Sequence, residues 1–248
     1  MGFSVVIPAR YASTRLPGKP LLDIAGKSML QHTYEKALQS NADSVTIATD
    51  DERIRDHAEG FGARVCMTSP EHRTGTDRIQ EVCTQLALSD SQIIVNVQAD
   101  EPLIPPSVIN QVAENLEREE EAGISTLCEI ISAKEEIEDP DSVKVVFDQR
   151  GFALYFSRST IPWQGSASAK NCYRHIGIYG YRVAVLNQFV DWPASALEVQ
   201  EKLEQLRAMD NGIRIHVAEC TENIPPGVDT EKDLAQVRAH IQSELKHS

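Results

Sequence analysis

A basic loop follows the first apolar run of the chain. Residues 3–8 have the composition of a buried strand, and the residues after them include Arg10, Arg15 and Lys19. Ligands of open α/β sheets bind at the carboxyl ends of the strands. Guanidinium groups can fork onto phosphate oxygens, and an ammonium adds a point charge. The loop therefore predicts a phosphate-binding site, with solvated surface cations as the alternative.

Two carboxylates stand where a metal ion bound to a triphosphate could be held. Asp100 follows the apolar run 92–97, and Asp229 lies in the loop before the last helical segment. Carboxylate oxygens are ligands that Mg²⁺ prefers. Either aspartate could instead cap a turn or the next helix, because Asp is favoured at both kinds of position.

A third candidate is the segment 74–78, which enters a helix with the sequence Thr-Gly-Thr-Asp-Arg. Backbone amides at a helix start, with Gly75 allowing a close approach, suit the phosphates of a nucleotide. The alternative is an ordinary N-cap by Thr74 or Thr76.

Short apolar runs alternate with segments of helical spacing in the first half of the chain. The expected strands are residues 3–8, 44–48, 64–67, 92–97 and 124–129, and the expected helices are 29–39, 51–60 and 76–86. This alternation predicts an α/β fold in which helices flank a mostly parallel sheet. The run 92–97 is apolar on both faces, as a central parallel strand is.

The pattern changes after about Glu129. The later expected strands are residues 144–147, 153–157 and 175–183, and the later expected helices are 196–209 and 230–245. We expect a single domain, residues 1–248, in which about 130–210 form a smaller inserted lobe.

Composition narrows the class of protein. The formal net charge of −13 disfavours a nucleic-acid-binding role, which needs a basic surface. The five cysteines are scattered, which favours free thiols in a reducing compartment. No run approaches the roughly 20 apolar residues of a membrane span. We therefore expect a cytoplasmic protein without a membrane partner.

Seven segments in chain order carry a family resemblance: IPARYASTRLPGKPL, RTGTDR, NVQADEP, YFSRSTIPW, RHIGIYGYR, LEQLR and GVDT. With them the chain resembles the 3-deoxy-manno-octulosonate (Kdo) cytidylyltransferases from Phe3 to about Arg238. The resemblance implies a GT-A-like nucleotidyltransferase fold and a homodimer, with residues 130–210 as the sugar-binding and dimerisation lobe. It implies a Mg²⁺-dependent transfer of CMP from CTP to the anomeric hydroxyl of Kdo, an acidic eight-carbon sugar, with release of pyrophosphate, in lipopolysaccharide biosynthesis.

The resemblance also assigns residues to roles. The predicted nucleotide-binding residues are Pro8, Arg10, Ser13, Arg15, Lys19, Thr74, Gly75 and Arg78. The predicted sugar-binding residues are Gln98, Arg158, His175, Tyr179 and Glu204. Asp100 and Asp229 are the predicted metal ligands, and with Arg10 and Lys19 they form the predicted catalytic set. No side chain stands out as an obligatory general base, and His175 is the nearest candidate by residue type.

Three departures from the family pattern leave the sugar open. Ala99 stands where the family usually has Gly, Gln164 and Gly165 stand where it often has Asp-Arg, and residues 196–199 read Ala-Leu-Glu-Val in place of Pro-Leu-Glu-His. The missing Arg would suit a variant such as 8-amino-8-deoxy Kdo, because an arginine repels an ammonium. Drift of the loop without effect on the substrate is the alternative. Other readings are a cytidylyltransferase for another acidic sugar such as sialic acid, and a non-catalytic nucleotide sensor.

Overall fold

The computed structural model describes residues 2–12, 16–131, 133–164, 172–222, 224–225 and 227–247. Its strands are β1 Phe3–Ala9, β2 Asp23–Ile24, β3 Lys27–Ser28, β4 Ser44–Thr49, β5 Arg64–Met67, β6 Ile93–Asn96, β7 Ile124–Ile131, β8 Lys144–Phe147, β9 Ala153–Ser157, β10 Cys172–Arg182 and β11 Ile215–Glu219. Its helices are the 3₁₀ turn η1 Lys19–Leu21, α1 Met29–Leu38, α2 Glu52–Gly60, α3 Gly75–Gln85, α4 Pro106–Arg118, α5 Lys134–Glu138, α6 Val183–Phe189, α7 Ala196–Glu201, α8 Gln205–Asp210 and α9 Glu231–His247.

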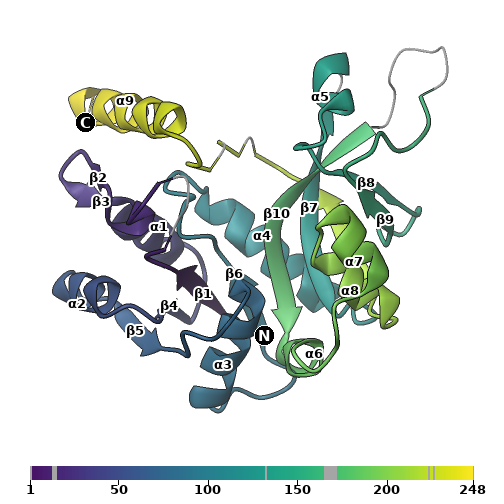
Figure 1. Cartoon of the computed structure of the whole chain (residues 1–248), viewed down its shortest axis with the longest axis horizontal. Helices are drawn as coiled ribbons and strands as arrows, with labels where there is room; N and C mark the ends of the chain where they lie inside the picture. Colours follow the sequence, from purple (N-terminus) through teal and green to yellow (C-terminus); the bar gives the residue numbers. More distant parts are fainter. Residues whose placement is uncertain are drawn as a thin grey trace.

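One mixed sheet organises the chain, with strand order β11-β7-β10-β6-β1-β4-β5 (Figure 1). Strand β1 pairs in parallel with β4 and β6, β4 pairs in parallel with β5, and β11 pairs in parallel with β7. Strand β10 is antiparallel to both β6 and β7. The mostly parallel α/β fold expected from the alternating pattern is therefore confirmed, with β10 as the antiparallel element near its centre.

The strands bury both faces, because helices cover the sheet on each side. Val5 and Ile7 of β1 join a core cluster with residues of α1, α2 and α4, whereas Val6 joins the opposite cluster with residues of α3, α6 and α8. Strand β6 divides in the same way, with Ile94 on the α3 side. This double burial explains the unbroken apolar runs of these strands.

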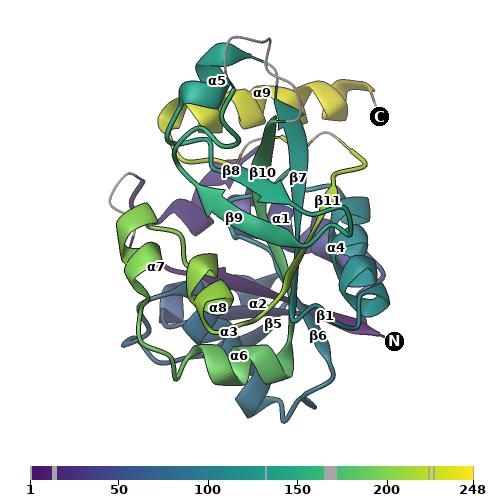
Figure 2. The same ribbon diagram turned by 90° about the vertical axis from the view of Figure 1, so that its right-hand side faces the viewer.

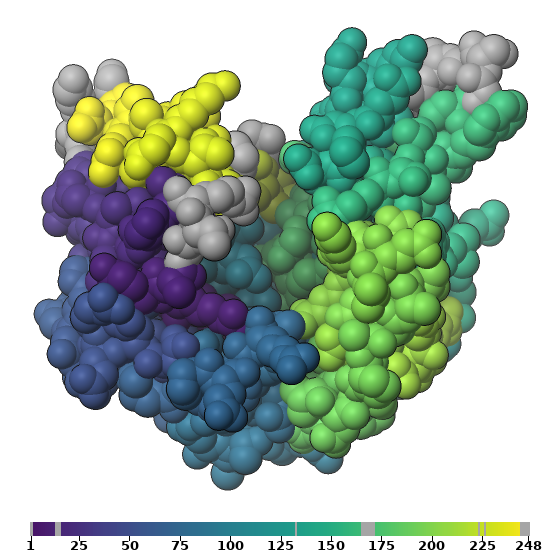
Figure 3. Space-filling view, viewed as in Figure 1, coloured from purple at the N-terminus to yellow at the C-terminus, as the bar shows by residue number. Residues whose placement is uncertain are grey.

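The second half of the chain differs from the main sheet in its shape. Strands β8 and β9 pair with each other and extend from β10, and they stand with α5 beyond one end of the sheet (Figures 1 and 2). Strand β10 falls inside the expected 130–210 lobe but is a central strand of the main sheet. The space-filling view shows a deep hollow between the α5 region and the N-terminal part of the chain (Figure 3). Helix α9 lies on top of the N-terminal part in this view.

The prediction of one helix over residues 196–209 is wrong, because two helices, α7 and α8, cover this range. Lys202 has a left-handed backbone (φ 55°) that ends α7, and α8 begins at Gln205. The side chains of Arg207 and Glu198 form a well-buried ion pair across the break, at 2.5 Å. The backbone amide of Lys202 donates to the carbonyl of Glu198 at the end of the helix. A left-handed residue is common at this position, although glycine is the commonest residue there.

Two expectations from composition can be compared with the structure. All five cysteines are free, as their scattered positions indicated. Among the described residues, no helix combines the length and the apolarity that crossing a membrane requires.

Candidate functional site

The ends of two parallel strands create the first pocket. Val6 of β1 is in register with Asn96 of β6, so the loops after the two strands leave the sheet at the same edge. The pocket between them has a volume of about 210 Å³. Its lining residues are Pro8, Arg10, Lys19, Pro20, Gly75, Gln98, Ala99 and Asp100. Segments that lie far apart in the sequence therefore meet where the strand pattern predicted a ligand.

Lys19 is the centre of the charged groups at this pocket. Its ammonium Nζ lies 2.6 Å from Asp100 Oδ2 and 3.0 Å from Asp229 Oδ1. The left-handed Gly18 (φ 66°) comes directly before the 3₁₀ turn that Lys19 begins. Burial lowers the pKa of Lys19, but hydrogen bonds and charge from the two aspartates outweigh it, so the pKa is raised. The lysine is therefore a firmly charged partner of both carboxylates.

The second aspartate reaches the pocket through a backbone contact. The amide of Val228 donates to the carbonyl of Asp100 at 2.9 Å, which ties the loop before α9 to the loop after β6. The two carboxylates then converge on one cationic group, although 129 positions separate them in the chain.

This donor set fits a magnesium ion in its chemistry. Two carboxylates already share a cation, the lysine ammonium, and hard oxygen ligands suit Mg²⁺. Within the described ranges, no group of three or more His, Cys, Asp or Glu side chains is placed to hold a metal ion. A cation here would therefore need further oxygens from a ligand or water.

The start of α3 borders the same pocket. Gly75, which is the first residue of the helix, lines the pocket. Thr74 is the N-cap and forms a capping box with Asp77. The hydroxyl of Thr76 donates to Glu204 Oε2 at 2.6 Å. The capping alternative for Thr74 is thus present in the structure, beside a helix end that faces the pocket.

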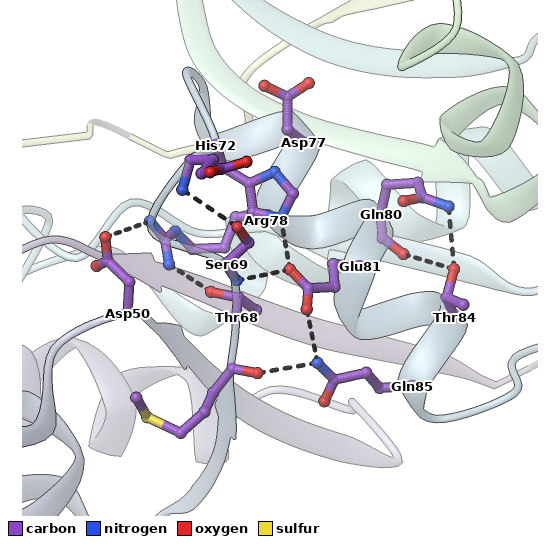
Figure 4. A network of polar contacts seen from close by, with 12 residues as sticks. Asp50, Thr68, Ser69, His72, Asp77, Arg78, Gln80, Glu81, Thr84 and Gln85 are labelled. Carbon is purple, nitrogen blue, oxygen red and sulfur yellow. Dashed lines mark hydrogen bonds and ion pairs between the residues drawn. The ribbon is translucent and has the colours of Figure 1, made fainter.

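Arg78 lies beneath the loop rather than in the pocket lining (Figure 4). Its side chain is fully buried, contacts Asp50 at 3.2 Å and donates to the hydroxyl of Thr68. Burial lowers the pKa of Arg78, and the charge of Asp50 opposes that shift. In this structure the guanidinium supports the segment that leads into α3.

A neighbouring network extends that support to Arg10. Glu81 accepts hydrogen bonds from the amide of Ser69 and from the ring of His72 (Figure 4). Arg10 Nη2 donates to the carbonyl of His72 at 2.9 Å. The position of Arg10 therefore depends on Glu81 of α3, through the loop that contains Ser69 and His72.

A larger, more acidic cavity of about 460 Å³ is lined by Glu101, the residue that follows Asp100. Its lining residues are Glu101, Glu136, Asp139, Asp141, Ser142, Val143, Arg174, His175, Ile176, Gly177, Ile224, Pro225 and Gly227. Four of these are acidic and one is an arginine. Burial, and secondly the charge of Asp100, raises the pKa of Glu101 to about 8.

The predicted sugar-binding residues do not form one group. Gln98 lines the smaller pocket and His175 the larger one. Arg158 Nε donates to the carbonyl of Glu201 at 2.8 Å, and Glu204 is engaged with Thr76. Tyr179 lies on β10, with its ring centroid 5.3 Å from that of His175.

Burial dominates the titration of these groups. It lowers the pKa of His175 to about 3, and the Nε2 atom of this ring lies 3.0 Å from the hydroxyl of Thr126. It also raises the pKa of Glu204 and of Tyr179. In each of these three groups, burial shifts the pKa in the direction that disfavours the charged form.

Six polar residues of the larger cavity were not predicted from the sequence: Glu101, Glu136, Asp139, Asp141, Ser142 and Arg174. Glu101 Oε2, Ser142 Oγ and Arg174 Nε are buried atoms without a hydrogen-bond partner. Glu101 directly follows Asp100 in the segment NVQADEP, which was the available signal. Arg174 begins the segment RHIGIYGYR, which was a comparable signal, whereas Ser142 carries none, because only the fold brings it to the cavity. The predicted residues Ser13 and Arg15, and Gly165 of the altered loop, lie outside the described residues.

Comparisons with known proteins agree with this geometry. Residues 4–215 match the family profile described as cytidylyltransferase. The fold and the site therefore define a nucleotidyltransferase of the cytidylyltransferase class. A 3-deoxy-manno-octulosonate cytidylyltransferase of Saccharophagus degradans is 54% identical over 98% of this chain and 100% of its own. One of Cellvibrio japonicus is 56% identical over 98% of this chain and 99% of its own. The chain belongs to the 3-deoxy-manno-octulosonate cytidylyltransferase family.

Solved structures give the same assignment. A CMP:2-keto-3-deoxy-manno-octonic acid synthetase complexed with CTP is 43% identical, with a TM-score of 0.93 over 98% of this chain and 100% of that one. A 4-diphosphocytidyl-2C-methyl-D-erythritol synthase is 13% identical, with a TM-score of 0.66 over 97% of this chain and 100% of that one, and it shares the fold alone. The expected GT-A-like nucleotidyltransferase fold is confirmed.

Proposed function

We propose that this chain transfers CMP from CTP to the anomeric hydroxyl of Kdo or a close variant and releases pyrophosphate. The observation that carries the proposal is the convergence of Lys19, Asp100 and Asp229 beside the Arg10 pocket. The family relatives, which match the chain along its length, support the choice of nucleotide and sugar. The product serves lipopolysaccharide biosynthesis, as the family resemblance implies.

The reaction needs positioning and charge neutralisation more than covalent chemistry by the protein. Asp100 and Asp229 would hold Mg²⁺, which supplies positive charge to the phosphates when bound. Arg10 and Lys19 would bind phosphate oxygens and stabilise the departing pyrophosphate. Gly75 lines the same pocket at the start of α3, where a backbone amide would add a neutral donor.

The sugar would occupy the larger cavity next to Asp100. His175 lines this cavity, Gln98 lines the neighbouring pocket, and Tyr179 packs against His175. Arg158 and Glu204 are bound to other groups, so their part would be to position Glu201 and the start of α3. The acceptor hydroxyl would then lie near the carboxylates that hold the cation.

One assay tests the proposed reaction. Purified protein mixed with CTP and Kdo should release pyrophosphate when Mg²⁺ is present, and should not when EDTA removes the cation. A parallel reaction with sialic acid should be slow. Absence of pyrophosphate with every sugar would leave the nucleotide sensor as the better reading.

Assembly and location are part of the same proposal. We expect a homodimer formed through about residues 130–210, in the cytoplasm, as the family resemblance implies. Sedimentation of the purified chain at several concentrations measures its oligomeric state. Fractionation of the cells that produce it measures its location.

A second candidate substrate is 8-amino-8-deoxy Kdo, which the acidic lining of the larger cavity favours. Glu136, Asp139 and Asp141 lie on that lining, and Arg174 is its one cationic residue among those described. Gln164 and Gly165 stand in the sequence where the family often has Asp-Arg. An ammonium near carboxylates is attracted to them, whereas an ammonium near an arginine is repelled. The repulsion between two like charges 4 Å apart costs about 1–4 kcal/mol.

The ratio of kcat/KM values for the two sugars at neutral pH decides between them. An amine preference of about tenfold or more is expected, which corresponds to about 1.4 kcal/mol. A tenfold preference for Kdo would reject the amine substrate and leave the transfer to Kdo itself in place.

A further inference from the structure

The ammonium of Lys19 occupies the space between the two carboxylates to which the proposed function gives the cation. It lies within 3.0 Å of an oxygen of each aspartate, and its side chain is only 11% exposed. Charge-assisted hydrogen bonds of this length are strong interactions. The same oxygens cannot serve the ammonium and a divalent cation at full strength, because both need close contact with the negative charge.

We propose that Lys19 competes with the divalent cation for Asp100 and Asp229 and moves to the triphosphate oxygens when CTP binds. This inference rests on the proposed function, since it assumes a nucleotide in the Arg10 pocket. It makes the cation and the nucleotide bind cooperatively. A cation alone must displace an ammonium, whereas CTP offers that ammonium a new partner.

The surroundings of Lys19 suit such an exchange. Lys19 belongs to the short turn η1 and itself lines the smaller pocket, so its flexible stem needs to travel only a short way. Arg10, the other cation of the described lining, is hydrogen-bonded to the carbonyl of His72 and does not contact the aspartates. Lysine is also a compact point charge with rotatable donors, which can change partners without a fixed fork geometry.

The protein's own ligands also leave the cation short of oxygens. Within the part of the chain that the structure describes, no third acidic, histidine or cysteine side chain completes a metal-binding group with the two aspartates. Magnesium prefers six oxygen ligands and takes several from water and phosphates. The triphosphate therefore removes the competing lysine and fills the coordination sphere at once.

The test is a binding measurement without sugar or turnover. Mn²⁺, a paramagnetic substitute for Mg²⁺, is titrated into the full chain in the absence of nucleotide, and free Mn²⁺ is read by electron paramagnetic resonance. Lys19→Met should bind Mn²⁺ about fivefold or more tightly than the wild type, the lower end of usual coupling between sites. In EDTA the same variant should bind CTP about tenfold or more weakly, as loss of a charged hydrogen bond predicts.

Lys27→Met is the matched control. Lys27 also lies near the N-terminus and pairs with Glu35, but it is 45% exposed and outside both cavities. It should leave both affinities unchanged. Lys19→Gln, which removes the charge and keeps a polar side chain, repeats the test if the Met variant does not fold.

Opposite changes in the two affinities support the exchange, because a purely structural role of Lys19 would weaken both. A Mn²⁺ affinity that stays equal or falls in both Lys19 variants overturns it. Adding Asp100→Asn to Lys19→Met should abolish the gained affinity, and its persistence would also overturn the proposal. Pyrophosphate release by the wild type tests the proposed function separately, so the two can fail independently.

Discussion

The two sides of the cleft differ in how their polar groups are engaged. On the nucleotide side, Lys19 pairs with both Asp100 and Asp229 beside the smaller pocket, and Asp229 is half exposed. On β10, His175 and Tyr179 are partly buried and pack on each other. Charges on the first side can exchange partners when a ligand arrives. Groups on the second side are fixed by the core, so changing them affects folding as well as binding.

The largest expected effect is on turnover, from the nucleotide side. Asp100→Ala and Asp229→Ala should each reduce kcat about a hundredfold or more, because each removes a proposed cation ligand. Both pairs with Lys19 are partly exposed, so the unfolding midpoint in urea should change little.

Asp56→Ala, a change at an exposed carboxylate on α2, is the control and should affect neither quantity. If either site variant keeps near wild-type turnover at saturating Mg²⁺, its metal role is wrong. If either unfolds readily, the contrast between the two sides fails.

The next effect is on stability. Arg78→Met should lower the free energy of unfolding by about 2–4 kcal/mol, because it leaves Asp50 without its buried partner. Urea denaturation followed by circular dichroism measures this. The surface change Arg55→Met on the neighbouring helix should leave the unfolding midpoint unchanged.

CTP affinity sharpens the same prediction for Arg78. If Arg78 acts only beneath the loop, the folded variant should lose affinity through the position of Arg10, a proposed phosphate ligand, so the loss should be larger for CTP than for CMP. A stable Arg78→Met protein that loses the same factor of affinity for CTP and for CMP would instead place Arg78 at the base.

The effect that is smallest at neutral pH is a pH dependence of stability from His175 on β10. The folded-state pKa of His175 is about 3, below its unfolded value near 6.5, so the unfolded chain binds more protons between these pH values. Stability should therefore fall as pH decreases from about 6.5 towards 3, with a slope of up to about 1.4 kcal/mol per pH unit from this group.

The difference in unfolding free energy between wild type and His175→Gln, measured from pH 4 to 7, isolates this contribution. His216 also has a lowered pKa through burial, and it is present in both proteins, so its contribution cancels. Parallel curves for the two proteins would show that His175 is not buried in its neutral form.

Much of the nucleotide side could be predicted from the sequence. Arg10, Lys19 and Gly75 follow or begin elements that a local pattern reveals, and the parallel arrangement brings the strand ends together. The direction of a side chain could not be predicted in the same way. Arg78 stands in a segment typical of nucleotide binding, and its side chain points beneath the loop to Asp50 and Thr68, so its contact with the nucleotide stays a prediction.

The sequence alone determined the α/β class, the alternation of strands and helices, and the family, because these follow from local periodicity and from motifs that stay together in the chain. Only the tertiary structure decided that β10 is a central antiparallel strand, that Lys19 bridges two aspartates from distant loops, and that Glu101, Ser142 and Arg174 share a cavity. Strand pairing and buried side-chain contacts join residues that are far apart in the chain. Their energies depend on the whole packed arrangement, which no local pattern records.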